Sequence, residues 1–431
     1  MNNEIKKKLN VHTIGCRLNQ YETEKMVADL IPYGFERSEN KKEKADLYII
    51  NSCTVTHRAD STVRNWIRKV ARQNPNGKIV VAGCYVDSEP ELIAGMEGVD
   101  VIVHNRDKNN IAKILVSKIP ELFSNEPDKC YSPILSSYHE HNRVWIKISD
   151  GCNQKCSFCK ITEVRGPLVN RDPKEIIDEI NAIVENGYKE VVLTGVHLGH
   201  YKNRKVDPQI KNLAALCQLI LQETDLSRLR ISSIEPQTVR DELLQVYVDS
   251  DGRICRHFHL PLQSGSSRIL REMRRPYNRE IYLKRVSDVK KAIPETNVGG
   301  DVIVGFPGET EEDYMETYRL AESGILDYLH VFSYSDRPGT VASQRTDKIN
   351  PEIIKERNAK LNRVSHAIKK EYYKKQIGKE LEVISEFGSK IKEMYFGISD
   401  NYVKVKMPNA QKGKKEIVKI KITQAYDDYV E

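Results

Sequence analysis

The sequence predicts an α/β protein in three parts: an N-terminal parallel α/β domain, a central partial (β/α)6 barrel and a C-terminal small β-barrel. Three observations predict it. Apolar strand-like runs alternate with helix-like stretches over residues 8–120, and the alternation resumes over residues 141–370. Short β-like pieces fill residues 375–431, and a Pro- and Ser-containing stretch over residues 121–140 is typical of a linker. Strands that alternate with helices form parallel sheets, which fixes the class of the first two parts.

Composition agrees with a folded protein. The chain has 431 residues, of which 39% are hydrophobic and 30% charged, and this excludes a disordered or fibrous chain. No apolar run approaches the roughly 18 residues that span a bilayer, and the basic N-terminus is followed by polar residues rather than a secretory signal. We therefore expect a cytoplasmic protein without membrane contact. The net charge of +7 permits an anionic partner such as nucleic acid.

In the N-terminal part, each predicted strand leads to a cysteine and then to a helix. The strands 10–15, 47–52 and 78–83 precede Cys16, Cys53 and Cys84, and the helices cover residues 22–30, 61–72 and 89–96. The carboxyl ends of parallel strands open on one edge of a sheet, so the three thiols are expected there together. Three thiolates at one edge would hold an iron–sulfur cluster with one open iron. Three buried structural cysteines are the alternative.

The central part offers six strand candidates separated mostly by helical patterns. They cover residues 143–148, 190–194, 228–234, 257–262, 298–305 and 328–334. The clearest helix has Asp172 as its N-cap, Pro173 at its first position, Glu175 closing a capping box and Gly187 as its stop. Six β/α units fit an incomplete barrel, in which chemistry gathers at the carboxyl ends of the strands.

A cysteine motif follows the first of these strands. Cys152, Cys156 and Cys159 have the spacing C-x3-C-x2-C in the segment SDGCNQKCSFCK. Three thiolates on one loop can hold three irons of a 4Fe-4S cube and leave the fourth open to a small molecule. A zinc site is the alternative, and it would need a distant fourth ligand such as His197.

Basic helices and short strands follow. Residues 351–375 carry eight Lys or Arg against three Glu, which suits either a solvated helix face or an RNA-facing one. The β-like pieces 380–384, 402–407 and 417–422 predict the small β-barrel, a fold that often holds single-stranded or looped nucleic acid.

The cysteine motif at the mouth of a β/α barrel resembles the signature of the radical S-adenosylmethionine (SAM) superfamily, with Phe158 as its aromatic residue. In that superfamily the open iron chelates SAM, and the cofactor carries the difficult chemistry while the protein positions it. By the same resemblance, Gly195 in LTGV would lie near the amino group of SAM. The resemblance implies these SAM-binding residues: Phe158, Thr194, Gly195, Ser232, Glu235 and Gln263.

Further segments resemble the methylthiotransferases, a radical SAM subfamily, over nearly the whole chain. They are HTIGCRLNQYETE, NSCTVT, VAGCY, SSIEP, HLPLQSGS, MRRPY and DVIVGFPGET, and NYVKVKM resembles part of the RNA-binding TRAM domain. The segments around Cys16 and Cys53 look most like the bacterial branch that acts on tRNA bearing N6-threonylcarbamoyladenosine.

The resemblance implies insertion of a methylthio group at C2 of that adenine, next to the anticodon, with two SAM molecules and two 4Fe-4S clusters. The cluster on Cys16, Cys53 and Cys84 would hold the sulfur that one SAM methylates, and the barrel cluster would cleave the second SAM. The expected partners are the tRNA anticodon loop, a flavodoxin- or ferredoxin-like electron donor and a sulfur source. No residue beyond the six cluster ligands is assigned a catalytic role.

Predicted RNA contacts come from two basic segments. Arg165 and Arg171 lie in RGPLVNRD, where that branch usually has a denser Arg run, and Arg274, Arg275 and Tyr277 lie in MRRPY. Residues 268–291 carry nine Lys or Arg against three acids, which also suits an outer barrel helix with a charged solvent face.

The remaining cysteines and two histidines favour structural roles. Cys217 and Cys255 are expected in the core or near a strand, and Cys130 in the linker. His257 and His259 alternate along a predicted strand, and we expect them to be packed or solvated.

Alternative functions stay open at this point. They are methylthiotransfer to isopentenyladenosine tRNA or to an aspartate of a ribosomal protein, and a non-catalytic iron–sulfur protein that binds RNA or carries electrons. A pure carrier normally has four protein ligands per cluster, which opposes the last.

Overall fold

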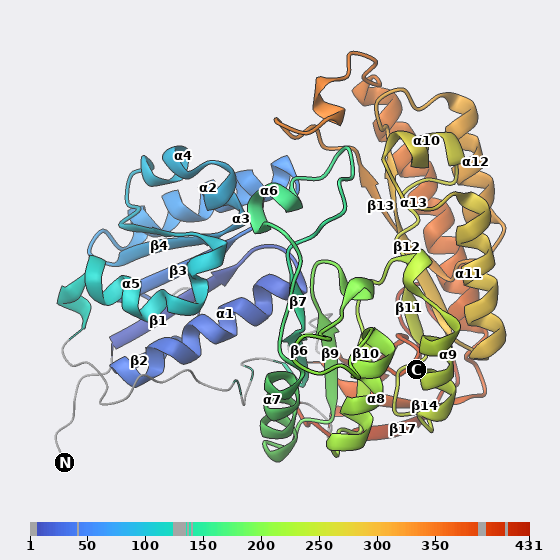
Figure 1. Ribbon diagram of the computed structural model, residues 1–431, viewed down its shortest axis with the longest axis horizontal. Helices are drawn as coiled ribbons and strands as arrows, with labels where there is room; N and C mark the ends of the chain where they lie inside the picture. The colour runs from blue at the N-terminus through green and yellow to red at the C-terminus, as the bar shows by residue number, and fades with distance from the viewer. Residues whose placement is uncertain are drawn as a thin grey trace. The chain divides into compact units, whose positions relative to one another are not determined.

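The computed structural model describes residues 7–40, 43–123, 135, 138, 141–386, 394–409 and 413–431 (Figure 1). The chain divides into two compact units. The first unit comprises Met1–Leu135, Gly151–Asn153 and Cys159–Pro167, and the second comprises Ser136–Asp150, Gln154–Phe158 and Leu168–Glu431. The predicted barrel and the predicted C-terminal domain thus share the second unit. Most of the predicted linker, with Cys130, lies outside the described residues.

A parallel sheet ordered β2-β1-β3-β4-β5 is the centre of the first unit. Its strands are β1 (Lys7–Thr13), β2 (Phe35–Arg37), β3 (Leu47–Ser52), β4 (Lys78–Gly83) and β5 (Val101–Val103). The prediction of a parallel α/β domain is confirmed.

Helices connect these strands. They are α1 (Arg17–Leu30), α2 (His57–Gln73), α3 (Cys84–Ser88), α4 (Pro90–Ala94) and α5 (Ile111–Lys118). The helix predicted over residues 89–96 is found as the shorter α4. The unpredicted α3 precedes it as a separate helix, because the ring of Pro90 disfavours helical backbone at Glu89. Helix α1 begins five residues earlier than predicted, with Cys16 as its N-cap.

Strand β3 is buried on both faces, as expected for the interior of a parallel sheet. Leu47 and Ile49 pack on one face with side chains of α1 and α5. Tyr48 and Ile50 pack on the other face with side chains of α2. The alternation along one strand therefore builds two apolar layers, which hold the strand ends in fixed positions.

The second unit contains the partial barrel. Its strands are β6 (Arg143–Lys147), β9 (Glu190–Thr194), β10 (Arg228–Ile231), β11 (His257–His259), β12 (Asn297–Val304) and β13 (Tyr328–Ser333). They form two parallel sheets, ordered β10-β9-β6 and β11-β12-β13. Parallel bridges from Leu229 to Ile254 and from Ser233 to His259 link the two sheets. All six predicted strands are present, and the partial barrel is confirmed.

Helices of this part of the chain follow the strands. They are α6 (Ile161–Arg165), α7 (Pro173–Glu185), α8 (Leu213–Glu223), α9 (Asp241–Asp249), α10 (Ser267–Glu272), α11 (Arg279–Ala292), α12 (Glu311–Glu322) and α13 (Pro351–Lys374). The Asp172 side chain caps α7 by accepting from the amide of Lys174. The capping box predicted with Glu175 is wrong, because that carboxylate instead lies 3.7 Å from the guanidinium of Arg171.

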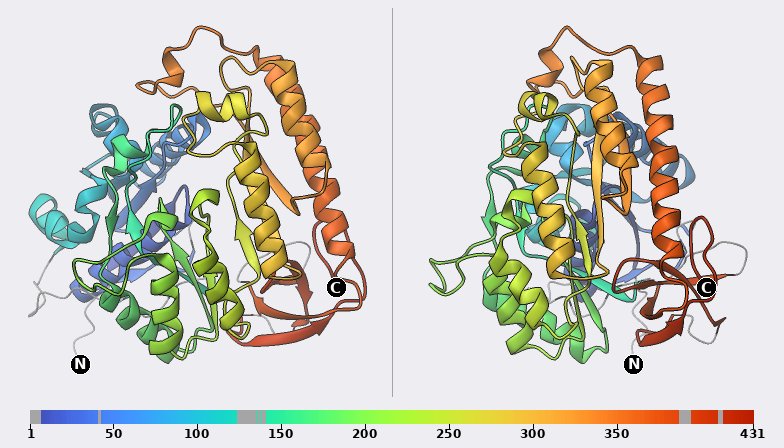
Figure 2. Two further views of the ribbon diagram at one scale, coloured as in Figure 1. Left: turned by 45° about the vertical axis from the view of Figure 1, so that its right-hand side comes forward. Right: turned by 90° about the vertical axis from the view of Figure 1, so that its right-hand side faces the viewer.

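An antiparallel sheet, ordered β16-β15-β14-β17, forms the C-terminal part of the second unit. Its strands are β14 (Glu380–Ser385), β15 (Tyr395–Ser399), β16 (Lys404–Met407) and β17 (Ile417–Lys421). The three predicted pieces are found as β14, β16 and β17, and β15 was not predicted. Helix α13 runs beside α12 and leads into this sheet in both views of Figure 2, and its Tyr372 and Tyr373 enter the core of the sheet.

A buried charge cluster attaches this sheet to the amino ends of the barrel strands. Glu190 lies 2.8 Å from Arg230, 2.7 Å from Arg228 and 3.5 Å from Arg143. Burial alone would raise the pKa of Glu190, but the three guanidiniums, Arg230 foremost, hold it at about 2. Arg230 also donates to the carbonyl oxygens of Ser399 and Asp400. The carboxyl ends of the strands therefore lie at the opposite end of the barrel from the C-terminal sheet.

A pair of two-residue strands, β7 (Ser149–Asp150) and β8 (Val169–Asn170), flanks the cysteine loop. Among the described residues, no helix has the length and apolar character needed to cross a membrane.

Candidate functional site

Three strands of the first unit end next to cysteines. Ser52 of β3 lies opposite Gly83 of β4, so Cys53 and Cys84 occupy the next position on neighbouring strands. Cys16 follows β1, the other neighbour of β3. The structure thus brings the first cysteine set, Cys16, Cys53 and Cys84, to one edge of the sheet.

Glycines let the three turns approach one another. Gly15 has a φ of +122°, and a Cβ there would lie 2.7 Å from the Cβ of Cys53. A Cβ on Gly83 would lie 2.5 Å from the carbonyl oxygen of Ser52. Burial raises the pKa of Cys53 to about 12, and the neighbouring thiols of Cys16 and Cys84 also raise it. Thiols with a raised pKa stay protonated at neutral pH unless a cation binds to them. Such thiols fit a metal cluster, because metal binding displaces their protons.

Buried amide side chains fix these turns. The Asn19 side chain donates to the carbonyl oxygens of Ile14, at 2.9 Å, and Ser52, at 3.0 Å, so it joins the turn before Cys16 to the end of β3. Asn51 donates to the carbonyl oxygen of Asn19 at 2.8 Å. The hydroxyl of Ser52 donates to the carbonyl oxygen of Ala82 at 2.6 Å, which joins β3 to β4. The position of each cysteine therefore depends on residues of the neighbouring strand ends.

A buried charge triad lies beside this set. Arg165 donates to Asn19 at 2.7 Å and to Glu22 at 2.9 Å, and Glu22 also accepts from Lys108 at 2.6 Å. All three charged side chains are at most 3% exposed. The triad carries a net positive charge, and Arg165 works against the burial that raises the pKa of Cys53. The positive charge of Arg165 thus offsets part of the effect of burial on the pKa of Cys53.

The segment after Cys159 also contacts the first set. The side-chain amide of Asn105 lies 3.4 Å from Sγ of Cys84 and donates to the carbonyl oxygen of Val164 at 2.9 Å. Val164 belongs to α6, which directly follows the C-x3-C-x2-C loop. Arg165, the last residue of α6, supplies the guanidinium described above.

The loop of the second cysteine set, Cys152, Cys156 and Cys159, donates hydrogen bonds to backbone carbonyl oxygens. Within the first unit, the amide of Cys152 donates to the carbonyl oxygen of Gly166 at 3.0 Å. Within the second unit, the hydroxyl of Ser157 donates to the carbonyl oxygen of Glu272 at 2.7 Å. No three His, Cys, Asp or Glu side chains in the described ranges are grouped as ligands of a single metal ion. Thiolates on a cube of four irons need not meet at one ion, because each of them binds a different iron.

One guanidinium points at the second set. Arg275 donates to Sγ of Cys156 at 3.1 Å and packs over the ring of Tyr277, 5.0 Å from its centroid. The Tyr277 hydroxyl donates to the carbonyl oxygen of Pro261 at 2.6 Å. Hydrogen bonds to a cluster's sulfur ligands tune its reduction potential, so Arg275 is placed to do this.

The predicted SAM-binding residues of the second unit follow the carboxyl ends of β9, β10 and β11. Thr194 ends β9, and a Cβ on Gly195 would lie 2.5 Å from Oγ of Ser149, so no larger residue fits there. Ser232 follows β10 directly, and its amide donates to the carbonyl oxygen of Leu193. Gln263 has a φ of +66°, a strained value that is often found at functional sites. Phe158 packs against the apolar cluster around Met273 and Phe306.

Glu235 has unusual surroundings among these residues. Its Oε2 is buried without a hydrogen-bond partner among the described residues. Burial raises the pKa of Glu235 to about 7, and burial lowers that of His197, whose Nε2 lies 3.4 Å from Oε1, to about 4. His197 is therefore neutral at pH 7, and the contact is not an ion pair. A buried carboxyl with an open oxygen suits a ligand amino group.

The predicted RNA-binding residues occupy different surroundings. Arg274 is exposed, whereas Arg171 donates to Glu179 at 2.7 Å and is about one-fifth exposed. Tyr277 is buried, and Arg275 is engaged with Cys156. Arg165 is buried against Glu22, so Arg274 is the most exposed of the five predicted residues.

Sequence reasoning missed the residues that support the cysteines. Asn19 and Glu22 lie one helical turn apart in the segment GCRLNQYETE, and this spacing was a usable signal. Lys108 and Asn105 lie far from Asn19 and Glu22 in the sequence, so no local pattern pointed to them. The structural expectation for His257 and His259 fits the fold: both are buried, and both contact the hydroxyl of Tyr328 at 2.8 and 3.0 Å. Cys217 and Cys255 are fully buried.

Comparisons with known proteins address the family. The family model described as Radical SAM superfamily matches residues 146–321, and the one described as Uncharacterized protein family UPF0004 matches residues 8–104. The chain is 38% identical to the threonylcarbamoyladenosine tRNA methylthiotransferase MtaB of Bacillus subtilis (strain 168), over 97% of this chain and 94% of that protein. This chain belongs to the radical SAM methylthiotransferase family.

Other relatives and solved structures agree. A tRNA-2-methylthio-N(6)-dimethylallyladenosine synthase of Wolinella succinogenes is 31% identical over 98% of both chains. The fold is similar to that of the radical SAM methyltransferase TsrM from Kitasatospora setae, solved with cobalamin and a [4Fe-4S] cluster. The TM-score is 0.58 at 14% identity, and the match covers 79% of this chain and 77% of that one. Membership confirms the enzymatic prediction and implies 4Fe-4S clusters and SAM as cofactors of this methylthiotransferase.

Proposed function

We propose that this methylthiotransferase inserts a methylthio group at C2 of N6-threonylcarbamoyladenosine, next to the anticodon of tRNA, with two SAM molecules and two 4Fe-4S clusters. The observation that carries the proposal is the presence of two sets of three cysteines. One set is gathered by three strand ends and the other lies on a single loop. Three protein ligands leave one iron of a cube open, so each set has room for a reacting group.

Support for the substrate comes from the relatives. The Bacillus subtilis and Aquifex aeolicus proteins, at 38% and 35% identity, are named for threonylcarbamoyladenosine. The relatives named for dimethylallyladenosine are 32% and 31% identical. The order of identity favours threonylcarbamoyladenosine over isopentenyladenosine.

The bound cofactors supply one-electron and methyl-transfer chemistry, and the chain itself binds, orients and excludes water. Arg275 donates to the Cys156 sulfur, and the triad around Arg165 places positive charge beside the first set. Glu235 offers a buried carboxyl oxygen to the amino group of SAM. Within the first unit, Asn105 and Arg165 connect the segment after Cys159 to the surroundings of the first set.

The proposal also includes partners that these residues do not supply. A flavodoxin- or ferredoxin-like donor provides the electrons, and a separate source provides the sulfur. The substrate adenine lies in an anticodon loop, whose unstacked bases a protein can reach without opening a duplex.

Nucleoside mass spectrometry tests the proposal. The anaerobically reconstituted protein is incubated with SAM, reductant and two tRNAs, one with threonylcarbamoyladenosine and one with isopentenyladenosine. We expect a methylthio group only on the first tRNA. A methylthio group only on the second would overturn the substrate assignment. Formation of 5′-deoxyadenosine with no change in either tRNA would overturn the tRNA assignment and leave the SAM chemistry intact.

A further inference from the structure

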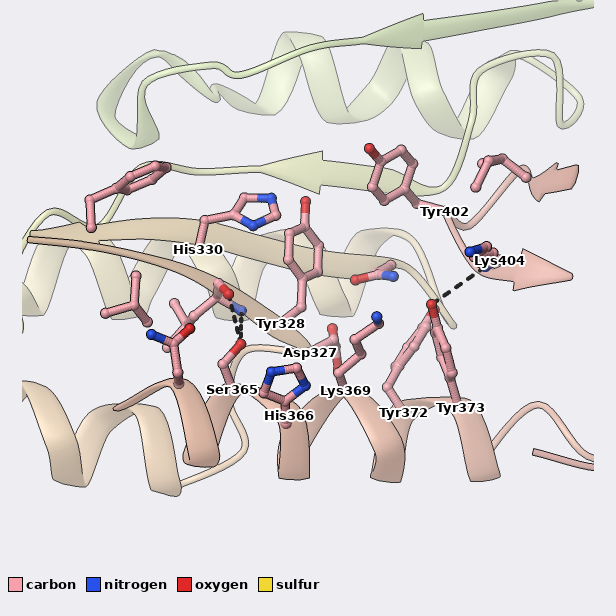
Figure 3. Close-up of a pocket in the computed structure, with 16 residues that line it drawn as sticks. Asp327, Tyr328, His330, Ser365, His366, Lys369, Tyr372, Tyr373, Tyr402 and Lys404 are labelled. Carbon is pink, nitrogen blue, oxygen red and sulfur yellow. Dashed lines mark hydrogen bonds between the residues drawn. The ribbon is translucent and has the colours of Figure 1, made fainter. Parts of the chain in front are cut away.

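A cavity of about 440 Å³ lies in the second unit, away from the cysteine loop. Its walls are strand β13, helix α13 and the start of β16 in the C-terminal sheet (Figure 3). Its volume lies within the range of about 300–1,000 Å³ that is typical of small-ligand pockets. The cavity adjoins the C-terminal sheet, at the opposite end of the barrel from the candidate SAM site.

Several aromatic side chains line the cavity. Tyr328 and His330 come from β13, His366 from α13 and Tyr402 from the turn before β16 (Figure 3). Tyr402 has a φ of +62°, and its ring stacks on His257 with centroids 4.2 Å apart, so it is held rigidly. Rigid rings at the walls suit a flat, unsaturated ligand such as a nucleobase.

The charge of the lining suits an anion. Lys404 is half-buried and has no carboxylate partner among the described residues, and its Nζ lies 4.1 Å from the centroid of Phe396. Lys369 lies 3.2 Å from the exposed Asp428, and its Nζ lies 5.3 Å from the ring centroid of Tyr373. Asp327 is the one carboxylate among the lining residues given by the structure, and it is engaged by Lys290 at 3.0 Å and by the amide of Val298 at 2.8 Å. Among the described residues, the cavity therefore combines a lysine that has no carboxylate partner with an aspartate that is already paired.

A buried acceptor is also open. Oδ1 of Asn297, a lining residue that is 3% exposed, has no hydrogen-bond partner in the described part of the chain. Its Nδ2 is fixed by the carbonyl oxygen of Asn401 at 3.0 Å, so the acceptor has a set direction. Such an acceptor is left unsatisfied in a folded protein unless water or a ligand donates to it.

Strand β13 continues this surface toward the carboxyl ends of the barrel strands. Tyr328, His330 and Phe332 share one face of β13, because alternate residues of a strand point the same way. Phe332, a large apolar side chain near the end of the strand, is 48% exposed. An aromatic path thus leads from the cavity to the end of the barrel where Thr194 and Ser232 lie.

We propose that this cavity holds one unstacked nucleotide of the substrate RNA, with its base among the Tyr and His rings and its phosphate at Lys404. The inference rests on the proposed function and deepens it, because it gives the RNA a second anchoring point away from the modified adenine. A single strand could then follow β13 from the C-terminal sheet to the reacting centre.

Binding of tRNA by the reconstituted protein tests the inference. We expect Lys404→Glu to weaken binding about tenfold at moderate salt and to lower the slope of log K against log salt by about 1, as for loss of a phosphate contact. His366→Glu, on the exposed wall of α13, should weaken binding about threefold without risk to the core. The matched control is Lys421→Glu, which changes the charge equally on the exposed β17 of the same sheet and should weaken binding less than twofold.

Photo-crosslinking with 4-thiouridine in the anticodon arm gives an independent readout. We expect crosslinked peptides that contain residues 328–332 or 402–404. Equal weakening by Lys404→Glu and Lys421→Glu, or crosslinks only elsewhere, would overturn the inference. So would binding of free AMP that depends on Lys404 while tRNA binding does not.

Failure of the inference is distinguishable from failure of the proposed function. If the wild-type protein modifies tRNA but Lys404→Glu and His366→Glu bind tRNA as the wild type does, only the inference fails. If the wild-type protein neither binds nor modifies any tRNA, the proposed function fails and the inference fails with it.

Discussion

The two cysteine sets are built in opposite ways. Cys152, Cys156 and Cys159 lie within eight residues, so their proximity is local and hardly depends on the fold. Cys16, Cys53 and Cys84 are separated by 37 and 31 residues and meet only because β1, β3 and β4 are neighbours in one sheet. Three thiol donors can thus be brought together by a short sequence motif or by the order of strands in a sheet. Donors brought together by strand order need a shell of neighbouring side chains that holds the strand ends in place. That shell is the network of Asn19, Ser52 and the Arg165 triad.

Removal of a ligand from each set gives the largest expected effects. Cys84→Ala should abolish methylthio insertion, by about 1,000-fold or more, yet retain SAM cleavage, whereas Cys156→Ala should abolish both. Measurement of 5′-deoxyadenosine and of modified nucleoside in parallel separates the two cases. Cys217→Ala, in the core of α8, is the control and should keep the iron content of the wild type. Loss of SAM cleavage in Cys84→Ala would break the comparison, because the sets would then not act separately.

Arg165→Met tests the side chains that support Cys16, Cys53 and Cys84. Removal of the guanidinium takes a cation from Glu22, which keeps Lys108, and takes the donor at 2.7 Å from Oδ1 of Asn19. We expect a loss of about 2–3 kcal/mol in the free energy of unfolding of the first unit, somewhat below the 3–5 kcal/mol typical of a broken buried pair because Lys108 remains. Urea denaturation of the apoprotein measures this. The double variant Arg165→Met/Glu22→Gln should recover part of the loss, and an unchanged stability in the single variant would contradict the role of the triad.

Arg275→Gln tests the surroundings of the second cysteine set, Cys152, Cys156 and Cys159. It removes the charged donor at Sγ of Cys156, and we expect SAM cleavage to fall about tenfold with a shift of the cluster's reduction potential. A potential measured by redox titration distinguishes this tuning from a structural defect, which would alter the iron content instead. Arg274→Gln, exposed on the preceding residue, is the matched control.

The smallest effect concerns Glu235. Its pKa of about 7 in the folded protein exceeds its ordinary value of about 4.5, so the folded state binds more protons between these values. Stability from this group is therefore present below about pH 4.5 and is lost as pH rises through about 7. Glu235→Gln should gain stability relative to the wild type between pH 5 and 8, by on the order of 1–2 kcal/mol. Thermal denaturation of the SAM-free proteins across this range checks it, and parallel pH profiles would contradict the raised pKa.

The sequence alone predicted the α/β class, the six barrel strands and the strand-end position of Cys16, Cys53 and Cys84. These follow from periodicity and from the geometry of parallel sheets. It did not predict contacts such as Lys108 with Glu22, 86 residues apart, because side-chain partners depend on packing that no local pattern encodes. The RNA roles assigned to Arg165 and Tyr277 by resemblance likewise stay predictions, since a positive or aromatic residue in a motif does not reveal whether it faces solvent. The sequence also did not predict α3, the five-residue helix directly after β4.

The buried cluster of Glu190 with Arg143, Arg228 and Arg230 has a consequence for biosynthesis. The ribosome makes residues 380–421 after every strand of the barrel. Until these residues emerge, Arg230 lacks the carbonyl oxygens of Ser399 and Asp400. The charged floor of the barrel, meaning this cluster at the amino ends of the strands, then stays open to water. At about 5–20 residues per second, the barrel waits several seconds for this cover. Completion of the barrel is thus coupled to the end of translation, and a nascent chain stalled before residue 399 would present that charged floor to chaperones.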